Sequence, residues 1–375
     1  MKRIIITTIL VLFIKHFVTA QSCLPEGIVF TTQEQIDSFY INYPGCVVIE
    51  GNIQIAGDEI TNLNGLENLS AIGGGLMVVN TPILVSLSGL DNVTIIENGL
   101  TISNTNLETL EGLHNLDSFF GTLSISTNPD LISIQSLINI DSISGYLALY
   151  HNYALTKLSG LDNVTSIGEY IFMHYNTSLF TLEGLDKLKS INGNLKIIDH
   201  PMLSSLSNLK KLRQINGDLL IVSNSSLSSL YGLDSLDSEG ITGLSINSNP
   251  LLEVCSVKSI CEIIIPLGVL ASIEDNAPGC STRQEVLAEC LVGVKKVNLE
   301  FDFSIFPNPA INEIFIEIDD GAFIDEINIY NHLGQKVWVI DHFTDRIDVS
   351  MLKPGIYLIE LISDRSKVRR KLLIK

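Results

Sequence analysis

The chain is poor in basic residues. It has 23 Lys and Arg against 42 Asp and Glu, for a formal net charge of −19, and residues 21–156 hold fourteen acidic residues with no Lys or Arg. Nucleic acids and anionic lipid surfaces are bound through a basic footprint that neutralises phosphates. The charge balance therefore argues against both as partners. With 46% hydrophobic and 17% charged residues, the chain is also too apolar for a disordered protein.

Long apolar runs are scarce as well. Residues 4–14 form an apolar run of eleven residues, which follows Lys2 and Arg3 and ends at Lys15. A membrane-spanning helix needs about 20 residues, whereas this length suits a signal peptide. The small residues at 18–20 favour cleavage before residue 21. The sequence thus predicts a signal peptide over residues 1–20 and no transmembrane segment after its removal, with a retained anchor as the alternative.

Catalytic motifs are not recognisable in the sequence. There is no HExxH, no P-loop and no GxGxxG after a strand, and the seven His residues stand apart from any Cys or Ser nucleophile motif. We therefore expect no enzyme activity, no catalytic residue, no cofactor and no metal site. Scattered carboxylates could be catalytic only if the fold brought them together, as in β-helical polysaccharide lyases, and this is the less favoured alternative.

Six cysteines lie in two groups near the ends of a long cysteine-free tract. They are Cys23, Cys46, Cys255, Cys261, Cys280 and Cys290. An even number in an exported chain predicts disulfides, and the five residues between Cys255 and Cys261 exceed the short spacing of a zinc site. Cys23 and Cys46 are the obvious first pair. The other four permit three connectivities, of which we favour Cys255–Cys280 with Cys261–Cys290.

Between the two groups of cysteines, the sequence repeats itself with a period of 24 residues, except for one spacing of 23 between Leu90 and Leu113. The leucines that mark the repeat, most of them preceded by Gly, are Leu66, Leu90, Leu113, Leu137, Leu161, Leu185, Leu209 and Leu233. The common pattern is L-x-G-L-x-x-L-x-x-I-x-G-x-L-x-I-x-x-N-x-x-L-x-x-L. Eight copies over residues 63–254 predict a solenoid, because coils that cannot bury their inward sides alone can share one core when stacked.

Within each repeat, the L-x-I step alternates with period two, which predicts a short strand with these apolar side chains inward. Successive strands would then form a parallel sheet along one side. A polar residue recurs after the strand, namely Asn128, Asn152, Asn176, His200, Asn224 and Asn249. Because a buried amide must be hydrogen-bonded, we interpret this series as a structural ladder between coils, with a binding role as the alternative.

This repeat frame resembles the receptor L-domain and leucine-rich-repeat solenoids over about residues 45–255. The resemblance implies a mainly β protein, a right-handed solenoid with an extended parallel sheet. The flanking segments fit as covers for the exposed ends of such a solenoid. We assign residues 21–62 to an N-terminal cap and first coil, and residues 255–292 to a Cys-rich C-terminal cap.

The tail has a different character. After a predicted linker at residues 293–302, period-two segments separated by short turns predict a small antiparallel, Ig-like β-sandwich over residues 303–375. Its motifs are F-P-N-P-A at 306–310, I-Y-N-H-L-G-Q at 329–335, L-K-P-G-I-Y at 352–357 and K-L-L-I-K at 371–375. In this order they closely resemble the type A C-terminal sorting domain of the type IX secretion system. A generic adhesion-type sandwich is the alternative.

The resemblance implies export to the outside of the outer membrane, with the outer-membrane secretion machinery as a partner and a passenger that is either anchored or released. The residues of the sorting-signal motifs are Pro307, Asn308, Pro309, Gly334, Gly355, Tyr357, Lys371 and Lys375.

The outward positions of the predicted sheet are the candidate recognition surface. Aromatic and His residues concentrate in two neighbouring coils, at Tyr146, Tyr150, Tyr170, Phe172, His174 and Tyr175, and the first five form the candidate binding site. The repeat places Tyr146 beside Tyr170 and Tyr150 beside His174. Such side chains suit a sugar ring or a protein partner. A cross-strand ladder that only stabilises the sheet is the alternative.

Together these observations predict an exported, non-enzymatic binding or adhesion protein, secreted or at the cell surface, whose solenoid face recognises an unknown glycan or protein. The alternatives are a structural surface protein without a specific ligand and a polysaccharide-active β-helical enzyme.

Overall fold

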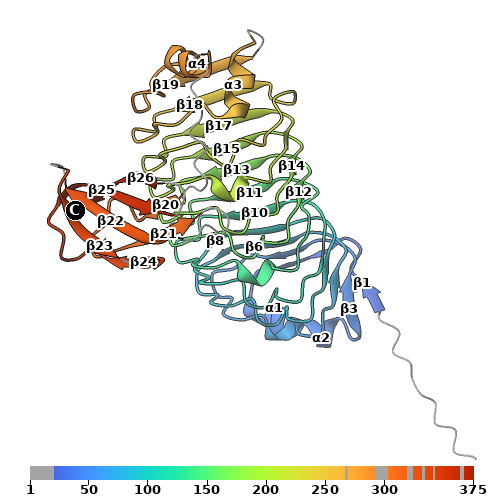
Figure 1. Ribbon diagram of the computed structural model, residues 1–375. Coiled ribbons are helices and arrows are strands. Elements are labelled where there is room, and N and C mark those ends of the chain that lie inside the picture. The colour runs from blue at the N-terminus through green and yellow to red at the C-terminus, as the bar shows by residue number, and fades with distance from the viewer. Residues whose placement is uncertain are drawn as a thin grey trace, which may run out of the picture.

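The structure, a computed structural model, shows a long solenoid with a small β-sandwich against its side (Figure 1). It describes residues 21–266, 269–291, 303–318, 324–331, 334–340, 343–363 and 367–375. The predicted signal peptide at residues 1–20 and the predicted linker at 293–302 lie outside the described residues. Within the described ranges, no helix is long and apolar enough to cross a membrane.

A parallel β-sheet follows the solenoid from end to end (Figure 1). Its strands, in spatial order, are β2 (Ile28–Phe30), β4 (Ile53–Ile55), β6 (Leu76–Thr81), β8 (Leu100–Thr105), β10 (Leu123–Ser126), β11 (Leu147–Tyr150), β13 (Ile171–His174), β15 (Leu195–Ile198), β17 (Asp218–Val222), β18 (Gly243–Asn247) and β19 (Leu270–Glu274). The strands from β6 to β18 are those of the eight repeats, so the predicted solenoid is confirmed. The sheet is longer than predicted, because β2, β4 and β19 come from the two caps.

Shorter elements line the other sides of the coils. One parallel sheet holds β1 (Gln21–Cys23), β3 (Cys46–Ile49), β5 (Ala71–Ile72), β7 (Ile95–Ile96) and β9 (Ser118–Phe119), and a second holds β12 (Ser166–Ile167), β14 (Ser190–Ile191) and β16 (Gln214–Ile215). Single turns of 3₁₀ helix occur at η1 (Asn64–Leu66), η2 (Gln135–Leu137) and η3 (Ser207–Leu209). Between β6 and β18, a stretch that the structure describes throughout, the single turns η2 and η3 are the only helical elements.

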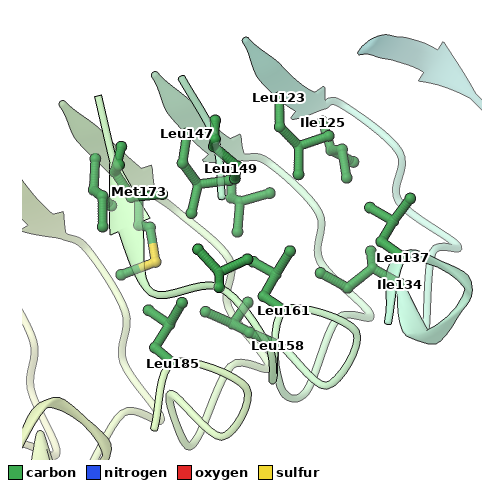
Figure 2. Packing of buried hydrophobic residues seen from close by; sticks show 14 of the residues in the cluster. Leu123, Ile125, Ile134, Leu137, Leu147, Leu149, Leu158, Leu161, Met173 and Leu185 are labelled. Atoms are coloured by element: carbon green, nitrogen blue, oxygen red, sulfur yellow. The ribbon is translucent and has the colours of Figure 1, made fainter. Parts of the chain in front are cut away.

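The repeated apolar residues fill the interior of the coils. All eight marker leucines are 0% exposed. In Figure 2, Leu147 and Leu149 of β11 point toward Leu158 and Leu161 across the coil, with equivalent residues in the neighbouring coils on either side. The core is therefore continuous along the solenoid, and each coil depends on its neighbours to bury its inward side.

Glycine before the marker leucine lets neighbouring coils approach through their backbones. Gly184 has a φ of +111°, and a Cβ added there would lie 2.1 Å from the carbonyl oxygen of Leu158 in the preceding coil. A residue with a side chain would be strained in this conformation and would overlap that carbonyl group. The Gly in the repeat pattern is thus required by the backbone itself.

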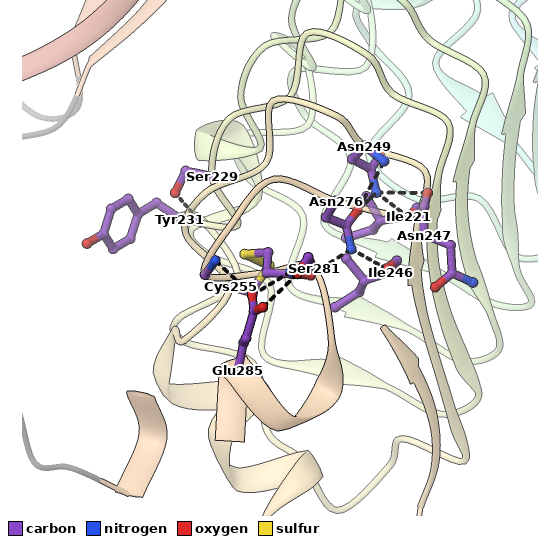
Figure 3. The surroundings of a disulfide bond; sticks show 12 residues. Ile221, Ser229, Tyr231, Ile246, Asn247, Asn249, Cys255, Asn276, Ser281 and Glu285 are labelled. Atoms are coloured by element: carbon purple, nitrogen blue, oxygen red, sulfur yellow. Dashed lines mark hydrogen bonds between the residues drawn. A yellow bond between two sulfur atoms is a disulfide. The ribbon is translucent and has the colours of Figure 1, made fainter. Parts of the chain in front are cut away.

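The polar residues after the strands join each coil to the next. Asn152 donates from Nδ2 to the carbonyl oxygen of Ile125 (2.9 Å), and its Oδ1 accepts the backbone N–H of Asn128 (3.3 Å). Equivalent bonds are made by amides that are all 0% exposed, Asn128, Asn152, Asn176, Asn224 and Asn249. Asn276 of the C-terminal cap accepts the backbone N–H of Asn249 (3.0 Å) and ends the ladder (Figure 3).

His200 replaces the amide in one rung of this ladder. Its ring is fully buried, and its Nδ1 accepts the backbone N–H of Asn176 (3.3 Å). The opposite ring nitrogen, Nε2, is buried with no hydrogen-bond partner among the described residues. Burial lowers the pKa of His200 to about 4, against the opposing effect of its backbone hydrogen bonds. The imidazole is therefore neutral at physiological pH.

Short helices and disulfides close both ends of the solenoid. The helices are α1 (Gln33–Asp37) and α2 (Phe39–Asn42) at the start, and α3 (Lys258–Ile264) and α4 (Arg283–Leu291) at the end. Helix α1 begins at a capping box, in which the Thr32 side chain accepts the Gln35 N–H and the Gln35 side chain accepts the Thr32 N–H. The disulfides are Cys23–Cys46, Cys255–Cys280 and Cys261–Cys290, the pairing favoured from the sequence; Figure 3 shows Cys255 beside the last ladder rung.

The tail is an antiparallel sandwich of two sheets around its own core. One sheet holds β20 (Phe303–Phe306), β21 (Glu313–Ile318) and β24 (Arg346–Asp348). The other, in the order β23-β22-β25-β26, holds β22 (Glu326–Asn331), β23 (Lys336–Ile340), β25 (Gly355–Ile362) and β26 (Lys367–Ile374). Apolar side chains from both sheets pack together, so the predicted sandwich is confirmed.

Candidate functional site

Strands β11 and β13 hold the predicted face residues on the outside of the sheet. Tyr150 pairs in register with His174, and Ala148 pairs with Phe172. Leu149 and Met173, between these positions, are 0% exposed, whereas Tyr150, Phe172 and His174 are half-buried. The alternation inferred from the L-x-I step therefore describes this part of the site correctly.

Tyr146 and Tyr170 form a separate pair at the other end of the same strands. Their rings stack with centroids 4.8 Å apart and an angle of 7° between the ring planes. Burial raises the pKa of Tyr170, and the neighbouring Tyr146 and Glu169 add to this. This contact is a cross-strand aromatic pair, which stabilises the sheet whether or not a ligand is present.

From β6 to β19, one residue at the end of each main strand, or directly after it, adopts a left-handed backbone conformation. In successive described coils these residues have φ between 54° and 59°, and they are Asn80, Asn104, Thr127, His151, Tyr175, Asp199, Ser223, Ser248 and Asp275. Most are Asn, Asp or Ser, whose short polar side chains suit turns. Tyr175 has a large ring instead, so its identity does not follow from the backbone requirement.

Two of these left-handed residues, His151 and Tyr175, place additional rings beside the predicted binding face. We define the rim cluster as His151, Tyr153, His174, Tyr175 and Asp199. The ring centroid of His151 lies 5.4 Å from that of His174, 5.5 Å from that of Tyr175 and 6.0 Å from that of Tyr153. Tyr153 and Tyr175 are 38% and 44% exposed, which is high for aromatic side chains in mutual contact.

Two polar contacts fix the rings of the rim cluster. His174 Nε2 lies 3.0 Å from Asp199 Oδ2, and His151 Nδ1 lies 3.0 Å from the Tyr153 hydroxyl. Both pairs are partly accessible, since the side chains of His174 and Asp199 are 31% and 37% exposed. Phe172 lies behind them, its ring stacked at 5.8 Å from that of His174. The cluster thus presents aromatic surface together with oriented hydrogen-bonding groups.

The rim cluster includes residues that the sequence-based site omitted. His151, Tyr153 and Asp199 were not singled out, and Tyr175 was counted among the aromatic residues but not placed in the site. The sequence feature that could have indicated these residues is their position at the end of the strand, where a left-handed residue ends the period-two alternation. Among the described residues, no group of three or more His, Cys, Asp or Glu side chains is arranged to hold a metal ion.

The sorting-signal residues of the sandwich lie far apart in sequence but meet in space. Asn308 donates from Nδ2 to the carbonyl oxygen of Lys371 (2.8 Å), and its Oδ1 accepts the backbone N–H of Leu373 (2.8 Å). The backbone N–H of Lys375 donates to the carbonyl oxygen of Ala310 (2.9 Å). The segment with Pro307 and Pro309 is thereby tied to the last strand, β26, so the first and last motifs form one structural unit.

The remaining sorting-signal residues shape turns and strand ends. The Gly334 N–H donates to the carbonyl oxygen of Asn331 (2.9 Å) in the turn between β22 and β23. Gly355 opens β25, opposite Ile374 of β26. The Tyr357 hydroxyl donates to the carbonyl oxygen of Lys353 (2.9 Å) and closes the turn before this strand.

Comparison with known families gives one match in the solenoid and one in the sandwich. Residues 45–131, in the first coils of the solenoid, match the receptor L domain family. Residues 304–375, nearly the whole sandwich, match the secretion system C-terminal sorting domain family. No match is found among curated proteins. The chain is thus a receptor-L-domain-like solenoid that carries a type IX sorting domain, and it is an exported protein of the cell surface, with the type IX secretion machinery as a partner.

Proposed function

We propose that this exported protein is a non-enzymatic recognition or adhesion protein, and that it binds a glycan or protein ligand at the rim cluster and the adjoining sheet face. The observation that carries the proposal is the exposed aromatic cluster around His151. An exposed Tyr175 in a left-handed backbone position contributes nothing evident to the core. Its presence there is better explained by contact with a partner than by folding.

The chemistry of the cluster suits such a ligand. Aromatic rings supply rigid apolar surface with little loss of side-chain freedom, and their edges and hydroxyl groups hydrogen-bond. The His174–Asp199 pair can both donate and accept hydrogen bonds at the edge of that surface. Lys196 pairs in register with Phe172 and adds one positive charge beside the rings.

A structural role without any ligand is the second candidate. The Tyr146–Tyr170 stack favours it, because this aromatic pair is explained by cross-strand packing alone. The two candidates differ in what they predict for the rim cluster, which a purely structural protein would not need.

The test is a glycan and surface-protein array probed with the full oxidised chain, followed by titration of any hit. Tyr175→Asn removes the ring and installs the residue that Asn80 and Asn104 supply at the equivalent position. We expect saturable binding that Tyr175→Asn weakens at least tenfold, with an unchanged unfolding midpoint. Phe172→Ala and His174→Ala should weaken the same binding.

Ser223→Asn is the matched control, because Ser223 occupies the same left-handed position two coils further on, outside the cluster. It should leave binding unchanged. A hit that survives Tyr175→Asn and Phe172→Ala would place recognition elsewhere. An array without hits would favour the structural role, and release of products from a polysaccharide panel would contradict the non-enzymatic proposal.

A further inference from the structure

The sandwich contacts the solenoid through a defined aromatic stack. Phe180, on the outer surface of the coil that contains β13, stacks on Phe306 of β20 with ring centroids 4.2 Å apart and 15° between the ring planes. Phe315 of β21 continues the stack behind Phe306 at 5.8 Å. Figure 1 shows the ends of β20 and β21 directed at the side of the solenoid.

A hydrogen bond to the sorting motif accompanies this stack. The hydroxyl of Ser226, a residue that is only 3% exposed, lies between two carbonyl oxygens, 2.7 Å from that of Asn308 in the sandwich and 2.5 Å from that of Pro201 in the solenoid, and shares its one hydrogen between them. At the equivalent position of earlier coils, Ser178 and Ala154 are half-buried and Asp130 is exposed. The extra burial of Ser226 therefore comes from the sandwich and not from the repeat.

Asn308 therefore contacts both the rest of the sandwich and the solenoid. Its side chain ties the F-P-N-P-A segment to β26, while its carbonyl group binds the solenoid. Beside this contact lies a cavity of about 500 Å³ between the two domains. Four sorting-signal residues from separate motifs line it, namely Asn308, Gly334, Tyr357 and Lys371. The side of the sorting domain that carries its signal is therefore turned toward the solenoid.

We propose that the solenoid is a docking partner of its own sorting domain, held through Phe180 and Ser226, and that the secretion machinery must displace this contact to reach the signal residues. Residues 178–181 and 226–229 form the docking surface. With the domain docked, Phe306 and Asn308 are each 8% exposed, so neither is available to a second protein at the same time. Docking and engagement by the machinery are then competing states of one chain.

The first experiment is small-angle X-ray scattering of the full oxidised chain and of Phe180→Ser, which leaves the sorting domain unchanged. Ser stands at the equivalent position in the next two coils, as Ser204 and Ser228. Loss of the stacked ring should weaken docking about tenfold. Because residues 293–302 can extend by about 33 Å, the maximum dimension should rise by roughly 20 Å on release.

The second experiment follows the rate at which the same variants reach the cell surface in a type IX-secreting host. Phe180→Ser should reach the surface faster than the unaltered chain. Ile132→Ser is the matched control, since Ile132 occupies the same position two coils earlier, is 53% exposed and lies away from the sandwich. It should change neither the scattering nor the rate.

Ser226→Ala, with the exposed Ser225→Ala as its control, tests the hydrogen bond separately and should shift both measurements in the direction of Phe180→Ser. Unchanged dimensions for Phe180→Ser would overturn the docking. Increased dimensions with an equal or lower export rate would overturn the competition between docking and export.

Discussion

His200 makes the stability of the solenoid sensitive to acid. Its imidazole is fully buried in the ladder, and burial lowers the pKa of the ring to about 4 from an ordinary value of 6.5. Replacing it by Asn restores the residue that occupies the other rungs and removes the titrating group. We therefore predict that His200→Asn flattens the pH dependence of the unfolding free energy between pH 7.5 and pH 4.

The magnitude follows from proton linkage. Below pH 6.5 the unfolded chain binds a proton on this imidazole, but the folded chain does not until the pH approaches 4. Protonation therefore stabilises the unfolded state relative to the folded state, and the unfolding free energy present above pH 6.5 falls as the pH is lowered. With these two pKa values the loss is about 2 kcal/mol at pH 5 and about 3 kcal/mol below pH 4. His200→Asn should escape this loss.

The assay is urea denaturation at pH 7.5 and pH 5, followed by far-UV circular dichroism. Fluorescence would report on the wrong domain, because the one Trp of the chain, Trp338, lies in β23 of the sandwich. The smaller Asn side chain changes packing equally at both pH values, so only the difference between them is informative. His114→Asn, at a half-exposed position, is the control. If His200→Asn and the unaltered chain lose equal stability on acidification, the linkage argument is refuted.

Three further predictions concern the repeat and its caps, each measured by urea denaturation. Asn152→Ala removes the buried hydrogen bonds to the Ile125 carbonyl and from the Asn128 N–H and should cost about 3 kcal/mol, whereas Asn106→Ala, which removes one exposed hydrogen bond, should cost less than about 1 kcal/mol. Gly184→Ala should cost about 2 kcal/mol or more, since its Cβ meets a carbonyl oxygen; an unchanged midpoint would contradict the proposed backbone contact. Replacing Cys255 and Cys280 by Ser opens a loop of 25 residues and should cost about 3 kcal/mol, and equal stability would show that the cap does not need this bond.

The fold was largely predictable because the repeat keeps nearly one length, with 23 to 25 residues between paired strand positions from β6 to β18. Residues 24 apart must lie side by side in stacked coils, which correctly placed Tyr146 beside Tyr170 and Tyr150 opposite His174. The extent of the sheet was less predictable. Strands β2 and β19 come from caps that lack the repeat pattern, and they pair because a neighbouring strand offers an open edge.

The rim cluster was only partly predictable for a local reason. Alternation assigns Tyr150 to the outside and residue 151 to the inside, but the left-handed conformation of His151 ends the alternation and brings its ring to the same face. The partner of His174 was missed because Asp199 is a polar residue at a turn, which has no distinctive pattern in sequence. The contact between Phe180 and Phe306 joins residues with no repeat relation, so nothing in the spacing could indicate it.

The left-handed residues differ from the residues that stabilise the solenoid, because their side chains lie on its surface and are not required for its packing. The interior leucines, the glycines and the amide ladder hold neighbouring coils together, and the left-handed residue directly before each ladder position takes no part in any of them. These display positions recur once per coil, at the spacing of neighbouring strands, about 4.8 Å. A long, regular ligand lying along the sheet would meet one such side chain per coil. Under the proposed recognition function, ligand specificity could be changed by substitutions in one coil at a time, or extended by adding coils, without any change to the interior.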